Sequence, residues 1–255
     1  MNVLFFVSGA FSNEILKRSK SELKKINNFK LVSNSKFKFI YPTEEYSKLK
    51  QYNCEIAISL GFTEKIKINN VRTTYGSYNI HQSILPNYKG RHPIQTMIIN
   101  GEKEYGCTLH VLDKNFDSGD IILSTYNKFK IVPKENTVKN LAIRDSSFLL
   151  NYLINNYKTG LNSKVKQKYS KDHIYAKKRT PTDSEITSEL SFETVKNMIR
   201  ALTVEGYKPF IVLNKKKLIV QNVFKYNLKN KNLLEYELIN KKVYLEISKK
   251  LKNSD

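Results

Sequence analysis

An amide and an imidazole stand two residues apart at Asn79 and His81, at the end of a short strand-like run. Residues two apart on a β-strand point to the same face, so both side chains would meet the same ligand. An amide donor beside an imidazole suits the stabilisation of a developing oxyanion while a proton moves near neutral pH. An isolated Asn-x-His pair is nevertheless more often a buried histidine with hydrogen-bonding neighbours, so the pair alone does not decide.

An acidic loop, Asp117-Ser118-Gly119-Asp120, follows a later strand-like segment. A carboxylate such as Asp117 could orient the imidazole and raise its basicity, or accept a proton itself. The other histidines and both cysteines have no spacing typical of a zinc site: His92, His110, His173, Cys54 and Cys107. We therefore expect acid–base chemistry without a metal, with His110 in the core or in a supporting position.

The elements that must position these residues alternate between strands and helices. Short apolar runs predict buried strands at residues 3–7, 37–40, 55–60, 78–81, 107–112 and 121–125. Helical spacing of apolar residues predicts helices at residues 12–26, 93–100 and 138–157. The alternation predicts an α/β domain with a mostly parallel sheet, which binds ligands beyond the carboxyl ends of its strands.

The pattern changes after about residue 160, where a lysine-rich connector begins. It leads to one amphipathic helix at residues 192–202. Strand-like runs follow at residues 210–213, 218–223, 233–238 and 243–247. We predict a catalytic domain at residues 1–176 and a small subdomain of one helix and β-hairpins at residues 177–255.

The chain of 255 residues carries 44 Lys and Arg against 23 Asp and Glu, a net charge of +21. Phosphate contacts dominate nucleic-acid binding, so this charge favours a nucleic-acid partner. The basic residues are spread over both halves of the chain, however, as a lysine-rich composition alone would spread them. No apolar run approaches the length of a membrane span, the apolar opening is typical of a buried strand rather than a signal peptide, and two unpaired cysteines are typical of a reducing compartment. We expect a cytoplasmic protein without a membrane partner.

Residues 79–122 contain several motif elements in a fixed order. Asn-x-His is followed by Ser-x-Leu-Pro-x-Tyr-Lys-Gly, then by Gly-x-Thr-x-His, then by Asp-x-Gly-Asp-Ile-Ile. In these elements the chain resembles the folate-dependent N-formyltransferases. That family includes methionyl-tRNA formyltransferase, glycinamide ribonucleotide formyltransferase and the nucleotide-sugar N-formyltransferases. A weaker resemblance extends over most of the chain, at residues 61–62, 178–183 and 199–202.

The resemblance implies a Rossmann-like domain that uses 10-formyltetrahydrofolate as co-substrate, with Asn79, His81 and Asp117 as catalytic residues and no metal. His81 would take the proton of the attacking amine or stabilise the tetrahedral oxyanion. Asn79 would donate to that oxyanion, and Asp117 would orient His81 and assist proton transfer. The folate would be held by Gly61, Phe62, Ser118, Gly119 and Asp120.

The acceptor amine separates the subfamilies. The Arg-Thr-Pro-x-Asp-Ser element at residues 179–184 and the short β-rich segment after it resemble the nucleotide-sugar enzymes. Those act on 4-amino-4,6-dideoxyhexoses or related amino sugars linked to dTDP or UDP, on the way to bacterial surface polysaccharide such as the O-antigen of lipopolysaccharide. We expect dTDP-4-amino-4,6-dideoxyglucose or a similar acceptor, held by Ser8, Tyr88, Lys89, Arg91, Arg179 and Tyr207.

Two alternatives stay open. The charge favours methionyl-tRNA formyltransferase, but the tRNA enzymes have a longer N-terminal domain, with a basic inserted loop, and a full C-terminal barrel. A non-enzymatic RNA-binding protein on the same scaffold is the second alternative, because a fold does not fix a function; the intact set of Asn79, His81 and Asp117 argues against it. The terminal hairpins present strand edges that could pair between subunits, so a homodimer is expected.

Overall fold

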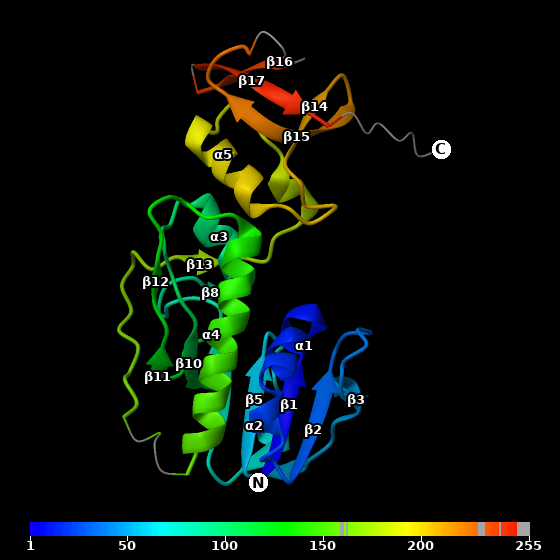
Figure 1. Cartoon of the computed structure of the whole chain (residues 1–255), viewed down its shortest axis with the longest axis vertical. Helices are drawn as coiled ribbons and strands as arrows, with labels where there is room; N and C mark the ends of the chain where they lie inside the picture. Colours follow the sequence, from blue (N-terminus) through cyan, green and yellow to red (C-terminus); the bar gives the residue numbers. More distant parts are fainter. Residues whose placement is uncertain (159–160, 162, 229–232, 240, 249–255) are drawn as a thin grey trace. The chain divides into compact units, whose positions relative to one another are not determined.

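The computed structural model describes residues 1–158, 161, 163–228, 233–239 and 241–248. The chain forms two compact units (Figure 1). The first unit comprises Met1–Pro93, Glu104–Lys128 and Val138–Ala176. The second comprises Ile94–Lys103, Phe129–Thr137 and the described residues from Lys177 onward.

The first unit is built on a mostly parallel sheet with the strand order β11-β10-β7-β5-β1-β2-β3. Its strands are β1 (Asn2–Val7), β2 (Asn28–Ser33), β3 (Thr43–Glu45), β5 (Ile56–Leu60), β7 (Ser77–His81), β10 (Thr108–Val111) and β11 (Ile121–Ser124). The pairs from β3 to β7 are parallel, whereas β10 is antiparallel to both β7 and β11. The predicted α/β class is confirmed.

The central strands are apolar along their whole length because both faces of the sheet are covered. Residues Val3 to Val7 of β1 and every residue of β5 are buried. One face packs into a core cluster made of Leu4, Phe6, Val32, Cys54, Ala57 and Val71. A continuous apolar run therefore identifies the middle of this sheet, as the sequence predicts.

The first unit has three α-helices among its described residues: α1 (Gly9–Arg18), α2 (Lys20–Leu23) and α4 (Glu135–Asn156). The first residues of α4 belong to the second unit. The helix predicted at residues 12–26 begins earlier and is interrupted at the buried Ser19, where the chain turns between α1 and α2. α4 runs beside β10 and β11 (Figure 1) and contacts Cys107 through the Ala142 carbonyl and the Ser146 hydroxyl. It thereby covers the strands that carry the site.

Short elements complete the first unit. They are η1 (Tyr46–Lys48), β4 (Tyr52–Cys54), η2 (Ile68–Asn70), β6 (Val71–Thr73), β8 (Lys89–Gly90), β9 (Glu104–Tyr105), β12 (Asn127–Lys128) and β13 (Tyr175–Ala176). The short strands pair as β4 with β6, β9 with β12, and β8 with β13. The β8–β13 pair ties the chain after α4 to the loop that follows β7.

The strand predicted at residues 37–40 is wrong. The second and third strands of the sheet are β2 and β3, on either side of that segment. Phe37 and Phe39 instead pack edge-to-face with ring centroids 5.1 Å apart, and the Ile40 N–H donates to the Asn13 side chain. The alternation of Phe37 and Phe39 resembles the pattern of a strand. The polar residues Asn28 and Lys30 interrupt the apolar pattern of β2, so that strand was not predicted.

The second unit contains a small antiparallel sheet with the strand order β14-β15-β17-β16. Its elements are α3 (Pro93–Ile99, whose Pro93 belongs to the first unit), η3 (Pro181–Ser184), α5 (Phe192–Ala201), β14 (Phe210–Leu213), β15 (Lys216–Phe224), β16 (Leu234–Leu238) and β17 (Lys241–Ile247). α5 begins where the Ser191 hydroxyl accepts the Thr194 N–H at 3.0 Å, which caps the helix. The predicted β-rich C-terminal subdomain is confirmed.

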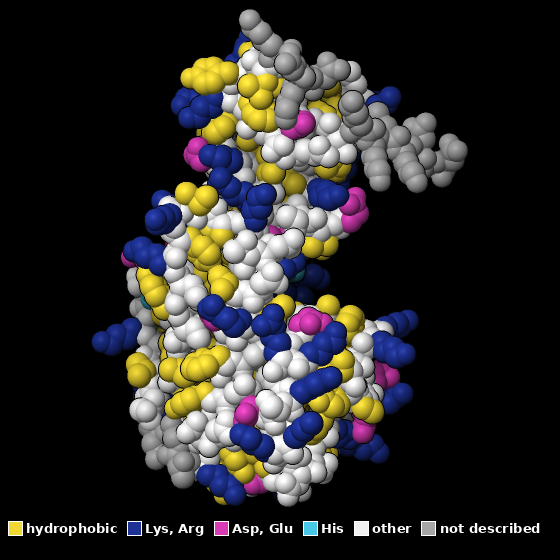
Figure 2. Space-filling model, viewed as in Figure 1, with side chains coloured by type: hydrophobic (Ala, Val, Ile, Leu, Met, Phe, Trp, Pro, Cys, Tyr) yellow, Lys and Arg dark blue, Asp and Glu magenta, His cyan; other side chains and the backbone are white. Residues whose placement is uncertain are grey.

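Lys and Arg side chains are spread over the viewed surface of each unit and are interleaved with hydrophobic and uncharged ones (Figure 2). Several basic side chains form exposed ion pairs three residues apart, as in Lys25–Glu22 and Lys208–Glu205. Exposed pairs of this kind contribute little stability. Among the helices that the structure describes, none combines the length and the apolar character that crossing a membrane requires.

Both thiols are predicted to be unreactive until the protein unfolds. Cys54 and Cys107 are buried and unpaired, and burial raises the pKa of Cys54 to about 11 and that of Cys107 to about 12. Because the thiolate is the nucleophile, modification by Ellman's reagent at pH 8 should be slower in the native protein than in urea by about 100-fold or more. Fast reaction of either thiol in the native state would contradict this burial.

Candidate active site

Strands β7 and β10 bring four polar side chains to one face of the sheet. Asn79 lies opposite His110 in the register, and His81 lies opposite Thr108. Directly opposed residues of an antiparallel pair project to the same face, and residues two apart on β7 do so as well. All four side chains are buried, His110 at 1% exposure and His81 at 5%. The shared face expected for Asn79 and His81 is therefore present.

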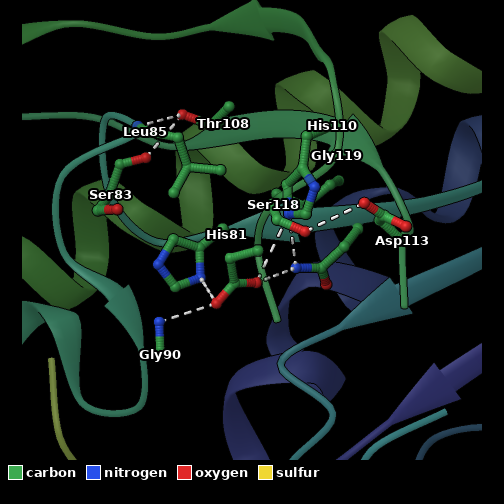
Figure 3. A network of polar contacts seen from close by, with 12 residues as sticks. His81, Ser83, Leu85, Gly90, Thr108, His110, Asp113, Ser118 and Gly119 are labelled. Carbon is green, nitrogen blue, oxygen red and sulfur yellow. Dashed lines mark hydrogen bonds and ion pairs between the residues drawn. The ribbon is translucent and has the colours of Figure 1, made fainter. Parts of the chain in front are cut away.

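The loop between β10 and β11 brings Asp117 to Asn79 and His81. Ser118 and Gly119 of this loop are drawn with His81 and His110 in the close view of the polar contacts (Figure 3). Because β10 is antiparallel to β7, the chain leaves β10 beside the residues that begin β7, where the Leu112 N–H bonds the Ser77 carbonyl. The loop must then fold back toward the end of β7. Asp117 takes part in this return with a φ of 51°, in the left-handed region that few non-glycine residues adopt.

The Asp117 carboxylate is enclosed by polar partners, with its side chain only 10% exposed. One oxygen, Oδ2, accepts the Gly90 N–H at 2.9 Å and lies 3.5 Å from His81 Nδ1. The other, Oδ1, accepts a proton of the Asn79 amide at 3.1 Å and lies 3.6 Å from His110 Nε2. The site is thus one carboxylate among two imidazoles, an amide and a backbone N–H.

These neighbours determine the charge of Asp117. Burial alone raises the pKa of the carboxyl group, but the nearby charge of His81 and the hydrogen bond from the Gly90 N–H outweigh it. The pKa of Asp117 therefore falls well below its usual range. Asp117 is ionised at neutral pH and provides a fixed negative charge.

The hydrogen bonds assign a proton to each imidazole. His110 Nδ1 lies 2.8 Å from the Val111 carbonyl oxygen, and His81 Nε2 lies 2.8 Å from that of Tyr88. A carbonyl oxygen only accepts, so both ring nitrogens carry a proton. His81 then turns its second nitrogen, Nδ1, toward the Asp117 carboxylate, 3.5 Å away.

Asn79 uses both protons of its amide within this cluster. One goes to Asp117 Oδ1, and the second goes to His110 Nε2 at 3.0 Å. Accepting this bond is consistent with His110 being neutral and protonated at Nδ1. Asn79 therefore links Asp117 to His110, which the sequence did not lead us to expect.

The residues predicted to hold the folate lie in two loops of the first unit. Gly61 follows β5 with a φ of 61°. The centroid of the Phe62 ring lies 5.6 Å from that of Phe6 and 4.9 Å from that of Tyr46. In the second loop, Ser118 Oγ bonds Asp113, and the Asp120 carbonyl accepts the Val111 N–H.

Gly119 of that second loop lies directly against β10. A Cβ at Gly119 would stand 1.9 Å from the Val111 carbonyl oxygen. Only a glycine therefore permits this close approach, which keeps the loop folded back onto the strand.

The predicted acceptor residues are divided between the two units. In the first unit, Tyr88 is buried, and its backbone carbonyl accepts a hydrogen bond from His81 Nε2. Lys89 Nζ lies 3.5 Å from the centre of the Tyr169 ring, and the Arg91 side chain donates to the Thr63 carbonyl. Ser8, at the end of β1, bonds the Asn34 side chain. Arg179 and Tyr207 belong to the second unit, where Arg179 bonds the Asp183 carbonyl.

Three contributors to the site were missed or undervalued. His110 was expected only in a core or supporting position, yet it contacts both Asn79 and Asp117; its place opposite Asn79 could have been found from the alternation of the two strands. The Gly90 N–H and the Gln167 amide, which bonds the Asp117 carbonyl at 2.9 Å, carry no signal of their own in the sequence. Among the described residues, no group of three or more His, Cys, Asp or Glu is placed to hold a metal ion.

Comparison with solved structures finds the same fold in three formyltransferases. WlaRD, a sugar 3N-formyl transferase solved with dTDP and 5-N-formyl-THF, is 22% identical with a TM-score of 0.70, over 98% of this chain and 99% of that chain. The N-formyltransferase of Helicobacter canadensis, solved with folinic acid and dTDP-3-aminofucose, is 18% identical with a TM-score of 0.70, over 97% and 99%. Methionyl-tRNA formyltransferase of Clostridium thermocellum is 19% identical with a TM-score of 0.61, over 97% and 99%.

A family model for formyl transferases matches residues 17–148, which is just over half of the chain and includes Asn79, His81, His110 and Asp117. The enclosed carboxylate, the two imidazoles and the amide thus lie inside the matched region, on the fold that the solved formyltransferases share. The chain belongs to the formyl transferase family.

Proposed function

We propose that this protein transfers a formyl group from 10-formyltetrahydrofolate to the amine of a nucleotide-linked amino sugar, such as dTDP-4-amino-4,6-dideoxyglucose or a 3-amino relative. The observation that carries the reaction is the ionised Asp117 enclosed with His81, Asn79 and His110. Overlap along nearly the whole chain with two enzymes solved with dTDP or a dTDP-sugar supports the acceptor class. Their folate ligands support the co-substrate.

The reaction needs an oxyanion partner and a route for one proton. The lone pair of the acceptor amine forms a bond to the formyl carbon, and the carbonyl electrons move to the formyl oxygen. The amine then loses a proton, the oxyanion re-forms its C=O bond, and the bond to folate N10 breaks as N10 gains a proton. Holding the two substrates together lowers the barrier further by orientation.

His81 is proposed as the group that meets the developing negative charge. Its second nitrogen faces Asp117 at 3.5 Å, and the ring is proposed to stabilise the oxyanion or to transfer a proton. Asp117 is proposed to fix the orientation of the ring. Both amide protons of Asn79 are donated to Asp117 and His110 in this structure. We propose that one of them is donated to the formyl oxygen instead when the substrates are bound.

The substrates are assigned to loops around this cluster. The pterin is proposed to lie against Gly61 and Phe62 and against the loop of Ser118, Gly119 and Asp120. Lys89 and Arg91 are proposed to meet the diphosphate, which favours cationic donors. Ser8 and Tyr88 are the other acceptor contacts proposed within the first unit, and Arg179 and Tyr207 of the second unit stay predictions from the sequence.

The second candidate function is formylation of methionyl-tRNA. It is favoured by the +21 charge and by the overlap with the Clostridium thermocellum enzyme, whose TM-score of 0.61 is below the 0.70 of the two sugar enzymes. For the proposed sugar enzyme we also propose a cytoplasmic location and a homodimer that pairs the edge strands β14 or β16.

An acceptor panel tests the proposed function. With 10-formyltetrahydrofolate, turnover is expected with the dTDP-linked 4-amino-4,6-dideoxyglucose or with its 3-amino or UDP relatives, followed by release of tetrahydrofolate. Charged initiator tRNA is the competing acceptor in the same assay. Turnover with the tRNA alone would replace the sugar proposal by the second candidate.

Asp117→Asn is expected to lower kcat on the order of 100-fold or more, because the negative charge that orients His81 is lost. The wild-type carboxylate has its pKa lowered by folding, so its contribution to stability is present above its unfolded pKa of about 4 and is lost as pH falls. The stability of the wild type relative to Asp117→Asn, measured by urea unfolding, should therefore decline below about pH 4. A constant difference from pH 7 to pH 2 would contradict the lowered pKa.

Gly119→Ala is expected to impair catalysis more than its loss of stability explains. Its Cβ would meet the Val111 carbonyl oxygen at 1.9 Å, so the loop that carries Asp117 must shift. Gly106→Ala is the matched control, because its Cβ would meet the Thr125 carbonyl oxygen at the same 1.9 Å outside that loop. Both variants should lose about 1–3 kcal/mol of stability in thermal unfolding, but only Gly119→Ala should lose most of its kcat. Equal kcat in the two variants would show that the approach of the loop does not matter for the reaction.

A further inference from the structure

A segment after α4, residues 165–169, holds the Asp117 loop at every second residue; we call it the loop strap. Val165 exchanges two backbone hydrogen bonds with Ile121, each 2.8 Å long. The Gln167 amide donates to the carbonyl oxygens of Asp117 at 2.9 Å and Gly119 at 2.7 Å. The Tyr169 hydroxyl donates to the Ser118 carbonyl at 3.1 Å. Consecutive carbonyls of the loop are thus bound from one side.

Gln167 is the buried member of the strap, with an exposure of 9%. Both protons of its amide are used on the loop, whereas its Oε1 is buried without a hydrogen-bond partner in the described structure. A buried acceptor without a partner is costly, so an apolar residue would suit the packing better. The side chain is therefore best explained by its two donors.

The loop needs such donors because of the conformation of Asp117. A left-handed non-glycine residue costs free energy and persists only where its surroundings impose it. The Gln167 amide bonds the carbonyl of Asp117 itself and that of Gly119, two residues further along the loop. It thereby opposes relaxation of the Asp117 backbone, which would carry the carboxylate away from its partners.

The strap also reaches the other side of the carboxylate. Lys89 Nζ lies 3.5 Å from the centre of the Tyr169 ring, a cation–π contact. The next residue, Gly90, donates its N–H to Asp117 Oδ2. Residues 165–169 thus contact both the loop that carries the carboxylate and the neighbour of the backbone group that binds it.

We propose that Gln167 is a positioning residue for formyl transfer, whose amide holds the Asp117–Gly119 turn so that the carboxylate stays between His81 and Asn79. The proposal rests on the proposed function. Gln167 acts on the reaction through Asp117.

The test uses Gln167→Met, which keeps the length of the side chain and removes both donors, and Gln167→Glu, which when ionised sets a negative charge against the two carbonyls. Misplacement of Asp117 is expected to lower kcat by about 100-fold with the KM of the acceptor nearly unchanged. The kcat of Gln167→Glu relative to wild type should rise as pH falls from 8 to 6, because burial raises the pKa of a glutamate and the protonated form regains one donor. A role in folding alone would give no such recovery.

The matched control is Gln95→Leu, which removes another partly buried amide, one that donates to Glu135 within the second unit. It should lower the unfolding midpoint without changing kcat. The proposal is overturned if folded Gln167→Met and Gln167→Glu keep the wild-type kcat, or if Gln95→Leu loses as much kcat as they do.

A second measurement does not depend on catalysis. Carboxyl-carbon NMR of Asp117 should show a higher pKa in Gln167→Met than in the wild type, because the carboxylate moves from His81, His110, Asn79 and the Gly90 N–H; in Gln95→Leu it should not change. If the pKa of Asp117 is higher in Gln167→Met but the wild-type protein transfers no formyl group, the positioning role stands and the proposed function is removed. An unchanged pKa in Gln167→Met would remove the positioning role.

Discussion

The carboxylate of Asp117 is a negative charge withdrawn from water, and a protein tolerates such a charge only when polar groups surround it. Here those groups are His81, Asn79, His110 and the Gly90 N–H. They come from β7, β10 and β8, so the charge is stabilised only when all three strands are in place. These partners lower the pKa of the carboxyl group, while the carbonyl oxygens of Tyr88 and Val111 each hold a proton on one of the two rings. Stabilisation of the charge and preparation for chemistry are therefore one arrangement.

The sheet explains why the arrangement takes this form. Its parallel part ends at β7, and the addition of the antiparallel β10 places His110 opposite Asn79 and Thr108 opposite His81. Antiparallel pairing also sends the chain away from the site, so Asp117 returns to it by a loop with a left-handed residue. The glycine at 119 lets that loop approach the Val111 carbonyl closely. The antiparallel direction of β10 thus places His110 beside Asn79, and it requires a tightly folded loop to bring Asp117 back to the same place.

Sequence patterns predicted the parts of the molecule that depend on local periodicity. The apolar runs of β1 and β5, the helix α5 and the common face of Asn79 and His81 all follow from such patterns. The strand at residues 37–40 was wrong because Phe37 and Phe39 pack on each other rather than in a sheet. The direction of β10, the Gly90 N–H and the Gln167 amide depend on tertiary contacts between distant segments, and no spacing in the sequence encodes them. Asp117 was identified by a family motif, since nothing local shows that its carboxylate is buried.

The contact between the loop at residues 117–121 and the segment at residues 165–169 has a consequence for how the protein is made. The polypeptide leaves the ribosome from its N-terminus, and the first unit can begin to assemble from β1 onward. Asn79, His81, His110 and Asp117 are all synthesised before α4 is complete, and the segment that secures the last of them comes after it. A nascent chain that has just finished α4 already contains these four side chains, but not the segment whose hydrogen bonds hold the Asp117 loop. Maturation of the site is therefore one of the last events in the synthesis of the first unit.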